Sequence, residues 1–156
     1  MTDAPIAAPV PGSSLTEAIA ERWVSLSMNS WPGAARPFLS EEKDPFRNPI
    51  GSTVRRNLHI LAREVLGGMQ EASVAPALDA LVRLHAVQDL SPGDAVRFVF
   101  DLRTAIRERA GTVPETMHAR IDSLALMAFS QYARCREQIF ELRLREIRFR
   151  AECATR

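Results

Sequence analysis

The chain has 156 residues, of which 46% are hydrophobic and 25% are charged, and its formal net charge is +1. This composition is ordinary for one globular domain, and the near-neutral charge gives no general attraction to nucleic acid or to an acidic membrane surface. Two cysteines are too few for a disulfide scaffold, and the longest apolar run is far below membrane-spanning length. We therefore expect a soluble cytoplasmic protein that neither binds nucleic acid nor inserts into a membrane.

The first helix is expected directly after a tail. Residues 1–13 are rich in Pro and Ala without hydrophobic periodicity, and they lack the basic and apolar regions of a signal peptide, so we expect a disordered tail. Ser14 to Glu17 form a capping-box pattern that opens a helix ending before Pro32. Residues 30–48 contain three prolines and three aromatic residues, which predicts a segment that wraps the globule and inserts its aromatic side chains. The aromatic residues are Trp31, Phe38 and Phe46.

The second helix is predicted to begin at Asn48-Pro49, since Asn is a strong N-cap and Pro at the first helical position loses no hydrogen bond. Its apolar residues recur at helical spacing and predict one buried stripe. Gly67-Gly68 is expected to end this helix with a left-handed C-cap. The stripe consists of Ile50, Val54, Leu58, Leu61 and Val65.

Two further helices are predicted before Gly111. Ser73 is expected to cap the third helix, with Pro76 in its tolerated first turn. Gln88 and Asp89 are expected to tie the following turn, and Ser91-Pro92 opens the fourth helix. No stretch alternates apolar and polar residues long enough to indicate a sheet. The fold class is therefore all-α, a five- to six-helix bundle that forms a single domain over residues 14–151.

The last predicted helix, residues 117–151, contains neither Pro nor Gly and would span about 50 Å. Its apolar residues step by four and three, the period of a coiled-coil seam. Two interpretations remain open: the helix packs lengthwise on its own domain, or it forms a homodimer stalk. In the second interpretation, five residues form the surface through which the dimer assembles and passes its signal to a partner. In a parallel dimer, Cys135 would face Cys135 of the second copy. These residues are Tyr132, Cys135, Ile139, Leu142 and Phe149.

The residues that could carry chemistry form no catalytic pattern. The chain has no phosphate-binding loop, no zinc spacing of Cys and His, and no set of nucleophile, base and orienting group. His59 lies with Arg55 and Arg63 on one helix face, which we interpret as a solvated basic face. His85 lies near a helix C-terminus, where a positive group suits the helix dipole. We expect no enzymatic activity, no metal site and no cofactor.

Three segments resemble the RsbRD-type N-terminal domain, which is associated with RsbT co-antagonist proteins of the bacterial stressosome. They are DPFRNPIGSTVRRNL (44–58), LVRLHAVQDLSPGDAVRFVFDLRTAIRE (81–108) and RIDSLALMAFSQYARCREQIFELRLREIR (120–148). The resemblance covers about residues 15–150. It implies a helical sensor domain, globin-like without haem, that dimerises and passes a signal down a terminal helix. The 156 residues leave no room for a STAS domain, so we expect a stand-alone module.

The function expected from the resemblance is a non-catalytic regulatory module that forms a homodimer and relays a signal to an unknown protein partner. One alternative is a ligand or redox sensor, with a buried apolar pocket or the Cys135 thiol as detector. Another is an accessory subunit of a respiratory complex in sulfur metabolism, a setting in which stand-alone relatives occur.

Overall fold

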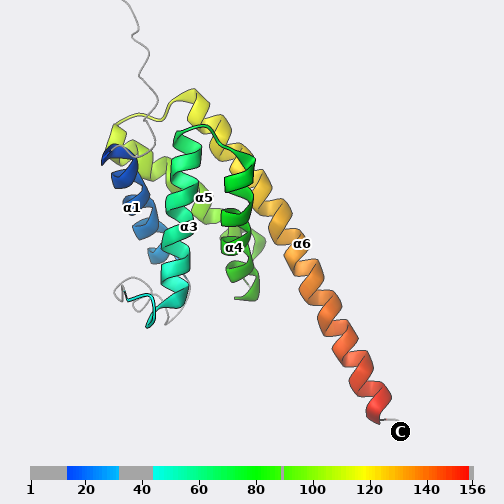
Figure 1. Cartoon of the computed structure of the whole chain (residues 1–156). Coiled ribbons are helices and arrows are strands. Elements are labelled where there is room, and N and C mark those ends of the chain that lie inside the picture. The colour runs from blue at the N-terminus through cyan, green and yellow to red at the C-terminus, as the bar shows by residue number, and fades with distance from the viewer. Residues whose placement is uncertain (1–13, 32–43, 89, 155–156) are drawn as a thin grey trace, which may run out of the picture.

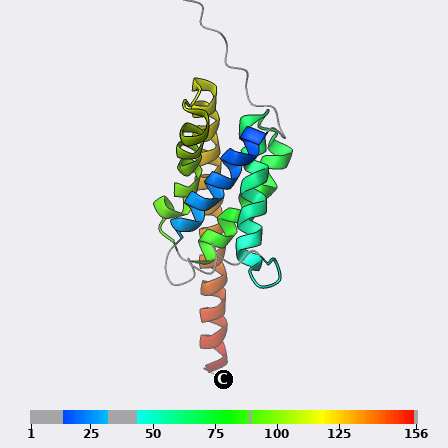
Figure 2. The same cartoon turned by 90° about the vertical axis from the view of Figure 1, so that its left-hand side faces the viewer.

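Five helices account for most of the structure, which is a computed structural model that describes residues 14–31, 44–88 and 90–154 (Figures 1 and 2). No strand occurs within these ranges, so the all-α helical bundle with a long terminal helix is confirmed. The predicted tail 1–13 and residue Phe38 lie outside the described residues. The helices are α1 (Ser14–Asn29), α3 (Pro49–Leu66), α4 (Glu71–Val87), α5 (Pro92–Ala110) and α6 (Glu115–Ala154).

The helices form a closed ring around one apolar core. Helix α1 packs against α3, α3 against α4, α4 against α6, α6 against α5, and α5 returns to α1. In Figure 1, α1, α3 and α4 stand side by side while α5 crosses behind them. Each helix contributes large side chains that are almost completely buried, so burial of apolar area holds all five together. Examples, one per helix, are Trp23, Leu58, Leu81, Leu102 and Ile121.

The predicted caps of α3 and α5 are confirmed. Asn48 Oδ1 accepts a hydrogen bond of 2.7 Å from the Gly51 N–H, and Pro49 occupies the first turn of α3. Ser91 Oγ accepts a hydrogen bond from the Asp94 N–H at 3.2 Å, with Pro92 at the start of α5. Each side chain satisfies a backbone donor that a helix start leaves without a partner. Gly111 ends α5 with a φ of +83°, a conformation that glycine adopts without strain.

The boundaries of α4 differ from the prediction. The helix begins at Glu71, with Gln70 rather than Ser73 at its N-cap, so Pro76 lies inside the helix and not in its first turn. A proline there cannot donate to the Ala72 carbonyl. Because Pro76 is exposed, water can satisfy that carbonyl. Helix α3 ends at Leu66, as predicted from the glycine pair, but the left-handed conformation falls on Met69 (φ 54°) and not on either glycine.

Side chains near the start of α3 lie further out than predicted. Ile50 is 39% exposed and is therefore not part of the buried stripe, and Phe46 is 97% exposed, so it is not inserted into the globule. Trp31, in contrast, is buried as expected.

The polar face of α3 is not a solvated basic face. His59 Nε2 lies 2.9 Å from Glu21 on α1, and His59 Nδ1 lies 3.3 Å from Glu17. Arg55 pairs with Glu21 at 2.9 Å, and Arg63 lies 3.9 Å from Glu17. The prediction was wrong because the sequence of α3 does not reveal which face α1 covers.

Helix α6 has 40 residues and is therefore about 60 Å long. Its first half closes the bundle, and its second half extends beyond the other helices in both views (Figures 1 and 2). Near its start, Arg120 donates hydrogen bonds to the carbonyl oxygens of Val65 (2.7 Å) and Gly67 (2.9 Å) at the end of α3. These charged hydrogen bonds satisfy carbonyls that a helix C-terminus leaves without partners, and they join the first part of α6 to the end of α3.

Candidate functional site

The predicted seam of α6 divides into a buried part and an exposed part. Tyr132 and Cys135 are only 3% and 7% exposed, packed within the chain's own bundle. The structure therefore corrects their assignment to a free dimer surface, and a Cys135 thiol facing its twin is not compatible with this packing. Ile139 is half-buried at the edge of the bundle. Leu142 and Phe149 are 62% and 67% exposed, and their role in a dimer stays a prediction.

The second part of α6 is the most exposed stretch of helix in the described structure. Every residue from Phe140 to Ala154 is exposed, over about 22 Å of helix. Within the described ranges, seven of the twelve exposed large hydrophobic side chains belong to α6, so the exposed apolar area is concentrated on this helix. Such concentrations typically mark interaction surfaces. The seven residues are Leu126, Phe129, Phe140, Leu142, Leu144, Ile147 and Phe149.

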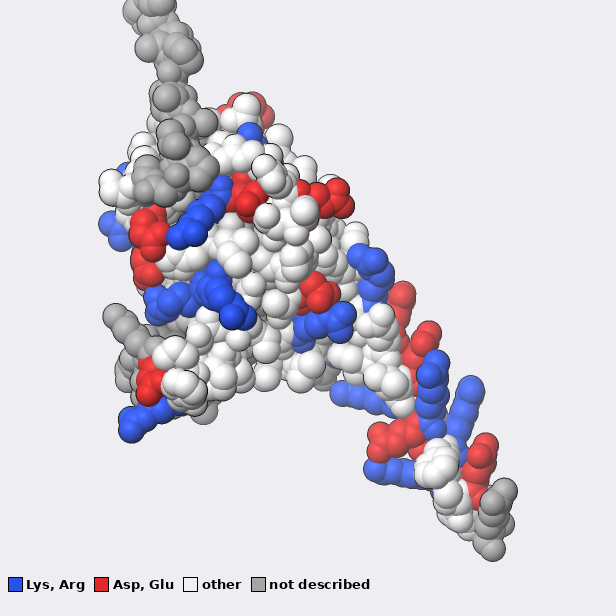
Figure 3. Space-filling model, viewed as in Figure 1, with Lys and Arg blue, Asp and Glu red and all other residues white. Residues whose placement is uncertain are grey.

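Five of these seven side chains form one stripe that runs along both halves of α6, and we call them the outer stripe. At about 100° per residue the five side chains lie within about 60° of one another around the helix, although about three turns separate Phe129 from Phe140. Their face adjoins that of Tyr132, which lines one groove with Phe129, and lies well away from that of Cys135. Acidic and basic side chains alternate around the projecting half (Figure 3). Glu141–Arg145 and Glu146–Arg150 are close enough to pair within the helix. The outer stripe consists of Leu126, Phe129, Phe140, Leu144 and Ile147.

The other predicted site residues that the structure describes are cap residues of helices. Asn48 and Pro49 start α3, and Ser91 and Pro92 start α5. Gln88 is the exposed C-cap of α4, and its N–H donates to the Leu84 carbonyl at 3.2 Å. Asp89 lies outside the described residues. Ser91 and Pro92 also line a shallow groove of about 420 Å³ that reaches Phe129 of the outer stripe.

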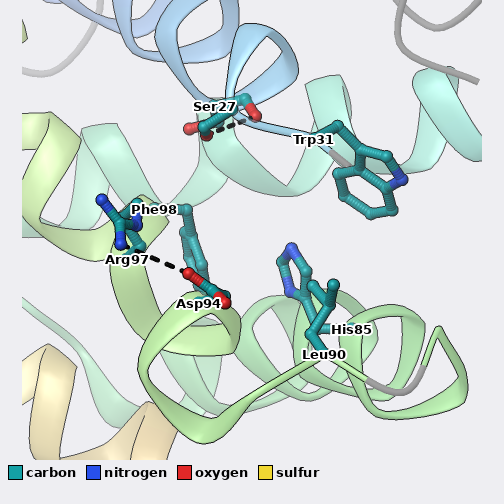
Figure 4. A pocket seen from close by; sticks show the side chains of 8 residues that line it. Ser27, Trp31, His85, Leu90, Asp94, Arg97 and Phe98 are labelled. Atoms are coloured by element: carbon teal, nitrogen blue, oxygen red, sulfur yellow. Dashed lines mark hydrogen bonds and ion pairs between the residues drawn. The ribbon is translucent and has the colours of Figure 1, made fainter. Parts of the chain in front are cut away.

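A second feature is a cavity of about 210 Å³ between α1, α4 and α5, whose lining residues the sequence did not predict (Figure 4). Its aromatic side is built from three rings. The His85 ring lies 4.9 Å from Trp31 and 5.2 Å from Phe98, centroid to centroid, and is within 17° of parallel to Phe98. Its polar side contains Ser27 and Ser30, with Asp94 and Arg97 on the first turns of α5. Leu90 completes the lining.

His85 is neutral at physiological pH, contrary to the positive group expected at the end of its helix. Burial lowers the pKa of His85 from its ordinary 6.5 to about 4, and the nearby Leu81 carbonyl opposes that shift only in part. The imidazole is 6% exposed, and a charge there would be poorly solvated. The prediction failed because it used the position along the helix and not the face. His85 follows Leu81 by four residues and Val82 by three, so the helical period itself indicated a buried position.

The described residues contain one group with suitable atoms for a metal ion, formed by Glu17, Glu21 and His59. Both carboxylates are exposed, and they already pair with arginines. Those guanidinium groups neutralise the site and would repel a cation, so the cluster is explained as an ion-pair network between α1 and α3.

In the described ranges no helix combines the length and the apolar character needed to cross a bilayer. Over 81 residues the chain is 30% identical to an uncharacterized protein from Archaeoglobus fulgidus, an alignment that covers 49% of this chain and 54% of the relative. The chain thus spans about half the length of that relative. No solved structure matches this chain, so the globin-like topology stays a prediction.

The family match covers nearly the whole helical bundle. Residues 17–147 match the model of the RsbT co-antagonist protein rsbRD N-terminal domain, a range that includes all of α3 to α5, most of α1 and the first four-fifths of α6. The chain therefore belongs to the RsbRD N-terminal domain family.

Proposed function

We propose that this chain is a regulatory module in which the outer stripe of α6 pairs with a second copy, and that the resulting dimer presents the projecting helices to a protein partner. Membership of the RsbRD N-terminal domain family supports a stressosome-like regulatory role. The observation that carries the proposal is the exposure of large apolar side chains along one face of a helix that leaves its own bundle.

A second copy suits this surface for two reasons. The outer stripe spans about 30 Å along α6, a length that a matching helix would cover. The charges beside it have both signs, so two copies would not repel one another strongly. Arginines and glutamates flanking an apolar stripe are the arrangement that sets orientation in paired helices.

The test is the solution mass, by size-exclusion chromatography with light scattering, of the wild type and of a Phe140→Glu, Ile147→Glu double variant. These side chains are 63% and 62% exposed, so the substitutions leave the core intact. Tyr132 is unsuitable for this purpose because glutamate at a buried position would unfold the bundle. We expect a dimeric wild type and a folded monomeric variant.

A matched control is Phe46→Glu, which introduces the same charge in place of a phenylalanine that is 97% exposed but far from α6 in the sequence. This control is expected to remain dimeric. A monomeric wild type, or a dimer that survives both glutamates, would rule out self-association through the outer stripe.

A further inference from the structure

We propose that the cavity lined by Ser27, Trp31, His85 and Phe98 is a binding site for a small neutral molecule that has one aromatic ring and a hydroxyl group. The site lies between α1, α4 and α5, and no residue of α6 lines it, so ligand binding can be measured separately from dimer formation. It gives the module an input that the family assignment alone does not specify.

The first argument is hydrogen bonding. Ser27 Oγ is buried and has no hydrogen-bond partner in the described part of the chain. His85 Nδ1 is also buried, and the acceptor near it is the Leu81 carbonyl of its own helix, which lies outside good hydrogen-bond geometry. Both residues are 6% exposed, and both line the same cavity although they come from α1 and α4. Buried polar atoms without partners are rare, because each one loses its hydrogen bonds to water without replacement. The unpaired Ser27 hydroxyl, with the weakly bonded His85 imidazole across the same cavity, points to a bound group that completes their hydrogen bonds.

The second argument is size. The cavity of about 210 Å³ is larger than the cavity of about 150 Å³ that accommodates benzene in a well-studied protein interior. It is smaller than the pockets of about 300 Å³ or more that accommodate drug-sized ligands. A single ring with a small substituent fits between these limits, whereas a tetrapyrrole would not fit.

The third argument is the chemistry of the lining. Trp31 and Phe98 provide aromatic surface, and the Ser27 hydroxyl and the His85 imidazole provide polar atoms that a ligand can bond. A hydroxyl group both donates and accepts, so it can bond a serine hydroxyl and a neutral imidazole in either tautomer. The exposed Asp94 and Arg97 at the rim are 3.3 Å apart and neutralise each other, which leaves no net charge to attract an ion.

The cavity is also adjacent to α6 through one residue. Leu90 lines the cavity, and its carbonyl oxygen accepts a hydrogen bond from the Tyr132 hydroxyl of α6 (Figure 4 shows Leu90 beside His85). A ligand that moves Leu90 would therefore act directly on a contact of the helix that leaves the bundle.

The test is an isothermal titration of the full chain with phenol, and with toluene as the ligand that lacks the hydroxyl. Two variants on the same helix are compared: Ser27→Ala removes the buried hydroxyl, and Ser25→Ala removes an exposed one. We expect saturable one-to-one binding of phenol, several-fold weaker binding of toluene, a threefold to tenfold weaker phenol affinity for Ser27→Ala, and an unchanged affinity for Ser25→Ala. That range corresponds to one ordinary hydrogen bond.

A second measurement uses the wild type alone, so it does not depend on how the variants fold. The His85 imidazole resonances are followed by NMR during the phenol titration and should shift with the same midpoint as the heat signal. Absence of saturable binding, equal affinity for phenol and toluene, an unchanged Ser27→Ala affinity, or His85 resonances that stay constant would each overturn the proposal. In that case water in the cavity forms the hydrogen bonds of Ser27 and His85.

Discussion

The Tyr132 hydroxyl on α6 donates a hydrogen bond to the carbonyl oxygen of Leu90, 42 residues earlier in the chain. This contact joins the buried half of the long helix to the turn between α4 and α5. The Leu90 side chain faces the His85 cavity, so the same turn lies between the cavity and the helix. A second contact, 3.4 Å from the Arg136 guanidinium to the Ala86 carbonyl, lies one turn further along α6. The arrangement places the proposed input and the proposed output on two sides of one short segment.

Replacing Tyr132 with phenylalanine should lower the free energy of unfolding by about 1 kcal/mol, because the ring stays buried while the Leu90 carbonyl loses its donor. Urea unfolding followed by circular dichroism measures the change, and the slope with urea should remain the same. If the variant unfolds at the wild-type midpoint, the hydrogen bond does not hold α6 to the turn.

His85 should make the bundle less stable in acid. Its pKa of about 4 in the folded chain is below the ordinary 6.5, so between these values the unfolded chain binds more protons than the folded chain. The stability attributable to His85 is therefore complete above about pH 6.5 and is lost as the pH falls toward 4. The full loss is on the order of 3 kcal/mol.

The measurement for His85 is the free energy of unfolding at several pH values for the wild type and for His85→Gln. The carboxylates titrate in both proteins, so the difference between the two curves isolates the imidazole. The free energy of unfolding of the wild type should fall relative to that of His85→Gln as the pH is lowered from 7 to 4. A constant difference would mean that His85 has an ordinary pKa and is not buried as described.

Glycine at position 51 is required by the Asn48 cap. A Cβ at Gly51 would lie 2.2 Å from the Asn48 side-chain nitrogen, so the amide would have to turn away and release the Gly51 N–H. Gly51→Ala should cost about 1 kcal/mol of stability, the usual value of an N-cap. The matched control is Gly93→Ala in the first turn of α5, where nothing lies within 4 Å of the added carbon.

The Gly93→Ala control should be neutral or stabilising by up to about 1 kcal/mol, since alanine restricts the unfolded chain more than glycine does. Thermal unfolding of the two variants gives the comparison. Equal effects at both positions would show that the Asn48 cap does not depend on the missing Cβ.

The two thiols should react at different rates. Cys135 is buried and Cys153 is exposed, and neither forms a disulfide. A thiol reagent should modify Cys153 rapidly in the native chain, and it should modify both cysteines in concentrated urea. Cys153→Ser should abolish the rapid phase, whereas Cys135→Ser should retain it. Rapid modification of both thiols in the native chain would show that the Cys135 side of α6 is open, and it would restore the redox-sensor alternative.

Local signals in the sequence determined where the helices begin and end. Asn48-Pro49 and Ser91-Pro92 act within one turn, and Gly111 relieves a backbone conformation that depends only on its own φ. Such features do not depend on the rest of the fold, so they could be predicted. The prediction failed at Pro76, where burial of α4 maintains a helix through a residue that normally interrupts one.

The sequence also predicted that α6 would be long and would have apolar residues on more than one side, but not which of these apolar residues would be exposed. Tyr132 and Leu142 fit the same seam, yet one is buried and the other is 62% exposed. The difference arises because α4 and α5 are shorter than α6 and end partway along it. Periodicity specifies the face of a helix, and only the neighbouring elements decide how far that face is covered.

The cavity depended entirely on the tertiary structure. Ser27 and His85 are 58 positions apart, and nothing in either helix alone indicates that their polar atoms converge. The charge state of His85 was likewise set by its packing between Trp31 and Phe98, because desolvation is a property of the surroundings and not of the residue. The sequence by itself determined the helices and their apolar faces, since these follow from local geometry. The tertiary structure decided which polar groups are buried together and which apolar groups remain exposed, since both depend on where the helices meet.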